Sequence, residues 1–242
     1  MFRDKKPTGF GSYKRYIINT LKFYEMKNES ITQLIFIIIL FAGFSAVMFF
    51  SRMDNSPYLF MFFGVLCFVI IYFASTIYLE AYLCELRGKD YSFKSCFSSV
   101  ISKFHKLVLS FISFSAILSI GTFLLIIPAF IFYFMFLFNT CYILDKNTGV
   151  MEAFNASRHL TTGRKMVIFS LFVVIDLILY FPMNIVPIIT AILGNYLISI
   201  FVSIFGLSIV TIMQQRLIAM LYVDLEYNTS DIKNNGDENE FF

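Results

Sequence analysis

A stretch without a charged residue runs from Leu107 to Leu144 and contains 38 residues. As one α-helix it would be roughly 57 Å long, because a helix rises about 1.5 Å per residue, and a bilayer core is only about 30 Å thick. We therefore expect two membrane spans here, at 107–124 and 128–144. The turn between them should lie between Gly121 and Pro128, since glycine relaxes the backbone and proline is tolerated at the first position of a helix.

Four other apolar runs are long enough to cross a bilayer. They predict spans at 31–50, 58–79, 166–189 and 192–213. The composition agrees with this interpretation, because only 14% of the residues are charged, against about 25% in a soluble globular domain. The predicted fold is an all-α integral membrane protein with six transmembrane helices.

The basic residues predict which side of the membrane each loop occupies. Of the 19 Lys and Arg, all but Arg52 lie in 1–30, 80–106, 145–165 or after residue 213, and basic residues accumulate on the cytoplasmic side of short loops. A multi-pass plasma-membrane protein with both termini cytoplasmic follows. Segment 1–30 is then a cytoplasmic amphipathic segment, 31–225 the membrane domain, and 226–242 a disordered acidic tail.

Each of the three longer cytoplasmic segments also carries apolar residues at helical spacing, which predicts amphipathic elbow helices lying in the membrane interface. The apolar stripes are Tyr13, Tyr16, Ile17, Leu21 and Tyr24, interrupted by Thr20; Phe93, Phe97, Val100, Ile101 and Phe104, capped by Ser92; and Val150, Phe154 and Leu160, opened by Asn147 or Thr148 and ended near Gly163. Ser95-Cys96-Phe97 aligns with Glu152-Ala153-Phe154. The chain therefore holds either three repeated units of elbow plus hairpin or three independent interfacial helices.

Several of these segments resemble the signature of a bacterial membrane domain. The matching residues are Leu124-Leu125-Ile126-Ile127-Pro128-Ala129, Tyr142-Ile143-Leu144-Asp145, Glu152-Ala153-Phe154-Asn155-Ala156-Ser157 with Gly163, and the closing Leu221-Tyr222-Val223-Asp224-Leu225. That domain occurs fused to glycerophosphoryl diester phosphodiesterases and also alone, in relatives of unknown function. The resemblance covers about Gly88 to Leu225, with Ala129 where the family more often has glycine. It implies a bacterial six-span membrane domain without an established activity and without the phosphodiesterase catalytic domain.

The costliest polar residue in a predicted span is Asp176, because an ionised carboxylate about ten residues inside a span costs at least about 2.5 kcal/mol. It is either a proton or cation relay or substrate contact, or a hydrogen-bonded group that joins helices. Arg216 is expected to contact lipid headgroups rather than to reach Asp176. Pro182 and Pro187 flank Asn184 and predict a kink or break in this span, a feature of transport sites and of passive packing alike.

Three residues of the third elbow, Glu152, Ser157 and Arg158, either contact a cytoplasmic partner or a lipid headgroup, or form a solvated face with helix capping. The two histidines, His105 and His159, stand alone, so we expect no metal site. The sequence has no Gly-rich phosphate loop, nucleophile elbow or paired-acid motif. We expect no enzyme, no catalytic residue and no cofactor.

The leading functional hypothesis is a non-enzymatic membrane protein that transports a solute or lipid, or supports membrane assembly. One alternative is a permease-like subunit that docks a cytoplasmic ATPase through an elbow helix. Another is a membrane-embedded lipid enzyme, for which the sequence assembles no cluster of polar catalytic groups. The expected partners are the lipid bilayer and either another membrane protein or a cytoplasmic ATPase. Nucleic acid is not expected, because the basic residues are not arranged as a binding surface.

Overall fold

The computed structural model describes residues 13–50, 57–124, 126–192, 194 and 196–237. Within these residues the chain is helical and contains no strand, which confirms the all-α prediction. The helices are α1 (Tyr13–Leu21), α2 (Glu29–Phe50), α3 (Pro57–Leu86), α4 (Phe93–Ser102), α5 (Phe104–Leu124), α6 (Ile126–Met135), α7 (Asn139–Lys146), α8 (Val150–Thr161), α9 (Lys165–Ile192) and α10 (Tyr196–Asp237).

Long apolar helices dominate the described chain. Five stretches are long and apolar enough to cross a membrane: Glu29–Val47, Phe62–Leu86, Phe104–Phe123, Ile127–Lys146 and Ile198–Tyr227. Large apolar side chains on their outer surfaces are exposed, including Phe41 at 72% and Phe123 at 91%. Soluble proteins rarely expose apolar surface on this scale. These are the features of a multi-pass membrane protein.

The turn between α5 and α6 lies inside the predicted interval, because α5 ends at Leu124 and α6 begins at Ile126. Gly121 lets the two helices meet closely: a Cβ atom there would lie only 2.9 Å from the Cα atom of Ala129. Pro128 is the third residue of α6, where the first was expected. A proline in the first turn removes no helical hydrogen bond, so the helix tolerates it.

The predicted span 128–144 is two helices, with a break at residues 136–138 between α6 and α7. Ser157 of α8 fills the break. Its Oγ accepts a hydrogen bond from the Phe138 backbone N–H at 3.1 Å and donates one to the Met135 carbonyl at 3.0 Å. Inside a membrane, a helix break is tolerated where other groups bond the freed backbone N–H and C=O groups. Here that group is the Ser157 hydroxyl, which comes from α8 and not from the sequence around the break.

Of the kink or break predicted in the next span, the break does not occur, because α9 is one continuous helix through Pro182 and Pro187. Each proline removes a single backbone hydrogen bond, and the flanking turns keep the helix together. The side chains of Pro182 and Asn184 lie outside the part of the structure that is described.

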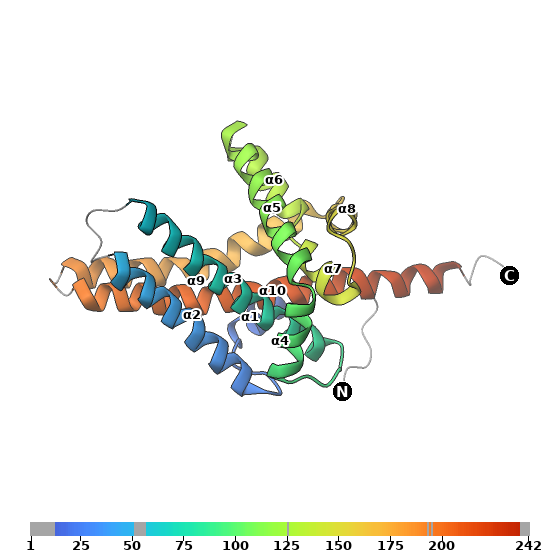
Figure 1. The fold of residues 1–242 in the computed structure, drawn as a ribbon. Helices are drawn as coiled ribbons and strands as arrows, with labels where there is room; N and C mark the ends of the chain where they lie inside the picture. The colour runs from blue at the N-terminus through green and yellow to red at the C-terminus, as the bar shows by residue number, and fades with distance from the viewer. Residues whose placement is uncertain (1–12, 51–56, 125, 193, 195, 238–242) are drawn as a thin grey trace.

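The three short amphipathic helices pack in the same way. Each buries its fourth and eighth residues: Tyr16 and Thr20 in α1, Cys96 and Val100 in α4, Ala153 and Ser157 in α8. Helix α4 packs on α3, α8 packs on α7, and α1 packs on α10 (Figure 1). Helices α4 and α8 thus each cover the last helix of the hairpin that precedes them in the chain, and α1 covers the last helix of the third hairpin. This supports the interpretation of three repeated units.

The three hairpins extend from a common core. Tyr78 of α3, Ile143 of α7 and Tyr222 of α10 are fully buried and belong to one cluster. Helices α2, α3, α9 and the first half of α10 run together from this core, whereas the α5–α6 hairpin projects in another direction (Figure 1). Helix α10 continues to Asp237, past residue 226, where the disordered tail was expected to begin. Glu226 belongs to the packed helix because it binds Tyr142 and Lys146 of α7.

Candidate functional site

Helix α10 carries three consecutive polar residues whose side chains contact three different parts of the structure: Gln214, Gln215 and Arg216. Gln214 donates a hydrogen bond from Nε2 to Oδ1 of Asp176 on α9, at 3.1 Å. Gln215 lines a cavity between helices. Arg216 donates from both terminal nitrogens to the Glu25 carbonyl, at 3.1 Å each. Successive helical residues point about 100° apart, so one turn of α10 serves three neighbours.

Asp176 and Arg216 are not brought together. The partner of Asp176 is the neutral amide of Gln214, which favours the role of a hydrogen-bonded group that joins α9 to α10. Arg216 is only 6% exposed, so the headgroup contact expected of it is wrong. Its guanidinium lies over the Tyr82 ring, 4.3 Å from the ring centre, a cation–π contact that suits a desolvated arginine. Arg216 therefore ties α10 to α3 and to the loop before α2.

The three residues predicted on α8 separate into different roles. The Glu152 carboxylate accepts a hydrogen bond from the Gly149 N–H at 3.0 Å, so it caps the start of its own helix. Ser157 is fully buried at the break between α6 and α7 and has no solvated face. Arg158 is exposed. Glu152 and Arg158 are thus exposed, and only Ser157 is buried.

Acidic residues gather near the ends of α3 and α7 and beside the second half of α10, and each is bound by a residue from another element. Glu80 accepts a hydrogen bond from Ser99 of α4 at 2.6 Å. Asp145 accepts one from Tyr222 at 3.0 Å and pairs with Arg87. These contacts join the short helices and loops to the ends of the long helices. We name this set of ion pairs and hydrogen bonds the polar layer.

A cavity of about 180 Å³ lies between α3, α5, α10 and the broken pair α6–α7. We call it the polar cavity, because hydroxyl and amide groups line much of it: Tyr72, Thr76, Ser110, Asn139, Thr140 and Gln215. Asn139 lies six residues before Asp145 along the chain, roughly 9 Å of helix. The polar cavity thus lies one to two turns from the polar layer, toward the apolar part of the helices.

Ser110 is the residue of this cavity whose hydrogen bonding is incomplete. Its side chain is 1% exposed, and its hydroxyl has no hydrogen-bond partner. Thr76, by comparison, donates to the Tyr72 carbonyl at 2.8 Å, and Oδ1 of Asn139 accepts from the Thr140 hydroxyl at 3.0 Å. A buried unpaired polar group costs about 1–3 kcal/mol. The hydroxyl oxygen has almost no accessible surface, so the side chain must rotate before a molecule in the cavity can bond it and remove that cost.

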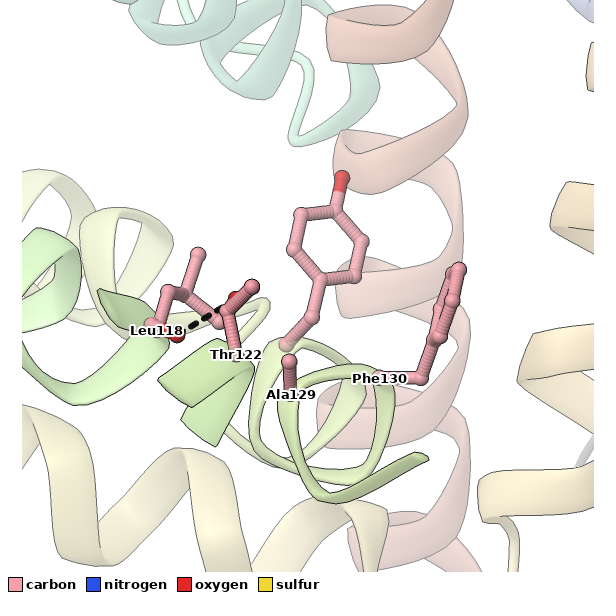
Figure 2. A pocket seen from close by; sticks show the side chains of 5 residues that line it. Leu118, Thr122, Ala129 and Phe130 are labelled. Carbon is pink, nitrogen blue, oxygen red and sulfur yellow. Dashed lines mark hydrogen bonds between the residues drawn. The ribbon is translucent and has the colours of Figure 1, made fainter. Parts of the chain in front are cut away.

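An open groove of about 240 Å³ lies between α5 and α6. We call it the apolar groove; it is lined by Leu118, Thr122, Ala129, Phe130 and Tyr133. Figure 2 shows Leu118 and Thr122 on one side of this space and Ala129 and Phe130 on the other. Thr122 donates its hydroxyl to the Leu118 carbonyl of its own helix at 2.9 Å, so its polar group is already satisfied.

The chemistry of the polar cavity is that of a neutral binding site. Its described lining contains no carboxylate, ammonium, guanidinium or imidazole group. Sequence reasoning missed this site, although Asn139-Thr140 inside the long uncharged stretch and Gln215 in the last span were signals of it. No protein-family model, curated protein or solved structure matches this chain.

Proposed function

We propose that this chain is a six-span protein of the bacterial plasma membrane, with both termini in the cytoplasm, and that it binds a lipid or solute in the polar cavity and moves it through the membrane. The observation that carries the proposal is Ser110. A buried hydroxyl without a partner, on the wall of a cavity lined by other hydroxyl and amide groups, is suited to a polar ligand.

The topology rests on helix length and charge. Helix α9 supplies the sixth span, because its 28 residues are roughly 42 Å long, more than a bilayer core requires. Arg87, Lys103 and Lys146 lie in the polar layer, and basic residues favour the cytoplasmic side. Helices α1, α4 and α8 then lie at the cytoplasmic interface as elbows. The resemblance of residues 88–225 to a bacterial six-span domain supports the same arrangement.

The proposal is non-enzymatic because of what lines the cavity. Hydroxyl and amide groups can hold a ligand, but a nucleophilic hydroxyl needs an adjacent base to become reactive. The described lining offers no such base. Binding and release, without bond making, is the chemistry this arrangement favours.

The test is reconstitution of the purified protein into liposomes. Fluorescently labelled lipids report movement between leaflets, and trapped radiolabelled sugars and amino acids report solute release. We expect transfer above that of protein-free liposomes, and at least a tenfold loss in Ser110→Leu, which fills the polar cavity. Ser119→Leu is the matched control, because Ser119 is an exposed serine of the same helix, bonded to the Ser115 carbonyl.

Two results would end the proposal. One is the absence of transfer for every probe by protein that remains folded, as judged by circular dichroism and a thermal melt. The other is transfer that Ser110→Leu and Ser119→Leu affect equally.

A further inference from the structure

We infer that the ligand is an uncharged amphiphilic lipid, with its hydroxyl-bearing head in the polar cavity and its hydrocarbon chain in the apolar groove. This inference rests on the proposed function and names the class of molecule that the same site would take. It follows from the relative position of the two spaces, from the charges around them and from their access to the bilayer.

The two spaces share a wall. Tyr133 of α6 lines both the polar cavity and the apolar groove. Its ring packs against Phe114 of α5, with the ring centres 6.0 Å apart, and Phe114 also lines the polar cavity. A molecule that occupied both spaces would pass along this aromatic pair.

Along α5, the direction from the polar cavity to the apolar groove leads away from the polar layer, as a lipid chain leads away from its head. Leu118 of the groove lies eight residues beyond Ser110 of the cavity along α5, roughly 12 Å farther from the polar layer. A head beside Ser110 would therefore lie near the polar layer, and the chain would extend toward the tip of the α5–α6 hairpin. That tip carries exposed apolar residues, including Phe123 at 91% and Ile127 at 72%, so a lipid could enter sideways from the bilayer.

The charges select an uncharged head. A phosphate-bearing head is normally bound by arginine or lysine, and neither lines the described cavity or groove. The nearest cations along the chain are committed elsewhere. Arg216 binds the Glu25 carbonyl, and Lys106, one turn before Ser110, binds the backbone carbonyl and the side-chain oxygen of Asn147. Lys103 binds Glu80, Ser99 and the Leu144 carbonyl. A hydroxyl head would find donors and acceptors without leaving a buried charge unpaired.

The size of the cavity also suits a small head. A volume of about 180 Å³ is that of roughly six water molecules, at about 30 Å³ each. This leaves room for a few carbons with one or two hydroxyl groups. A nucleotide-bearing head would be too large without movement of the helices.

The experiment compares two lipids that differ only in the head group. Protein purified in mild detergent is titrated with radiolabelled dioleoylglycerol, which is uncharged, and with dioleoylphosphatidylglycerol, which is anionic and has the same chains. We expect saturable binding of dioleoylglycerol and at least tenfold weaker binding of the anionic lipid. Ser110→Ala should weaken dioleoylglycerol binding about fivefold through loss of one hydrogen bond, and Ser119→Ala should leave it unchanged.

A second variant tests the chain-binding part. Ala129→Phe places a ring in the apolar groove and should weaken binding of dioleoylglycerol at least tenfold, with a smaller loss for the short-chain dioctanoylglycerol. Each variant is checked by circular dichroism and a thermal melt. Binding of dioleoylglycerol that neither Ser110→Ala nor Ala129→Phe changes would overturn the inference, as would equal or tighter binding of the anionic lipid.

The failure of this inference differs from the failure of the proposed function. If dioleoylglycerol does not bind but liposome transfer still depends on Ser110, the ligand class is wrong and the proposed function stands. If dioleoylglycerol binds as described but no liposome transfer is seen, the site stands and the proposed movement is wrong.

Discussion

At the scale of single residues, the polar side chains of the helices behave in two ways. Ser203 and Thr211 donate to carbonyls one turn back in their own helix, at 2.8 Å each, and so join nothing together. Ser157 and Gln214 bond across to other helices. Interhelical hydrogen bonds in membrane proteins contribute about 0.6 kcal/mol on average and up to about 1.7 kcal/mol, so the second kind should matter more for stability.

Asp176→Asn should leave both stability and liposome transfer intact, because an asparagine oxygen can still accept the hydrogen bond of Gln214. Asp176→Leu removes the acceptor and should destabilise the protein by about 1 kcal/mol. Thermal unfolding in detergent and the liposome assay measure the two effects. Loss of transfer in a stable Asp176→Asn protein would instead assign the carboxyl a proton-carrying role.

Ser157→Ala should destabilise the protein by about 1–3 kcal/mol, because it leaves the Phe138 N–H unpaired in a buried break. The Met135 carbonyl keeps a weaker partner in Thr161, at 3.4 Å. Asn155→Ala, at an exposed position of the same helix, is the control and should have little effect. Equal unfolding temperatures for the two variants would show that the break does not depend on Ser157.

At the scale of elements, the starts of α4 and α8 follow the same local rule. In α4, the Ser92 hydroxyl accepts from the Ser95 N–H at 3.2 Å, and the Ser95 hydroxyl accepts from the Ser92 N–H at 2.8 Å. In α8, Glu152 reaches back to the Gly149 N–H in the same way. In both helices the third residue caps the start, so local sequence is enough to set where the helix begins.

The reactivity of the Cys96 thiol can report on the stability of the Ser92 cap of α4. Burial raises the pKa of its thiol to about 11, and the side chain is 2% exposed, so the reactive thiolate is scarce near pH 8. An unfolded thiol ionises near pH 8.5. The unfolded state therefore loses its proton first, and the stability of the folded protein should fall as the pH rises from about 8.5 to about 11.

Ser92→Ala should destabilise α4 by about 1 kcal/mol and speed maleimide labelling of Cys96 about fivefold at pH 8. The measurement uses a protein in which Cys67, Cys84 and Cys141 are replaced by alanine. Ser102→Ala, at the exposed end of the same helix, is the control. Labelling that is already fast without the Ser92 change would contradict the burial of this thiol.

At the scale of the whole molecule, α10 holds the assembly together. It packs against α1, α2, α3 and α9, and its contact with α1 joins the first described helix to the last. Tyr16 of α1 donates a hydrogen bond to Oδ2 of Asp224 at 2.7 Å. Asp224 is 5% exposed, so this contact lies inside the core and joins α1 to α10.

Tyr16→Phe should lower the free energy of unfolding by about 2 kcal/mol, the contribution of a hydrogen bond to a charged group. Tyr13→Phe is the matched control on α1, since the Tyr13 hydroxyl bonds Ser170 at the surface and its loss should change little. Thermal melts that give the unfolding temperatures of both variants test this prediction. If Tyr13→Phe lowered the unfolding temperature as much as Tyr16→Phe, the stabilising role of the hydrogen bond between Tyr16 and Asp224 would lose its support.

Part of this architecture could be predicted from the sequence because its causes are local. The α5–α6 turn lies near Gly121, where the backbones touch, and α4 begins at the predicted cap Ser92. The same reasoning failed at Pro182 and at residues 136–138. A proline alone does not break a helix whose other bonds remain, and a helix without proline breaks where Ser157, from α8, replaces its backbone bonds.

The sequence by itself determined the helical class and the apolar runs, because each depends on residues within one helix or loop. Only the tertiary structure decided where the polar groups meet. Ser110, Asn139 and Gln215 are distant along the chain, yet they line one cavity, and Arg216 is buried against Glu25. Hydrogen bonding and burial depend on neighbours in space, and the packing of separate helices creates those neighbours.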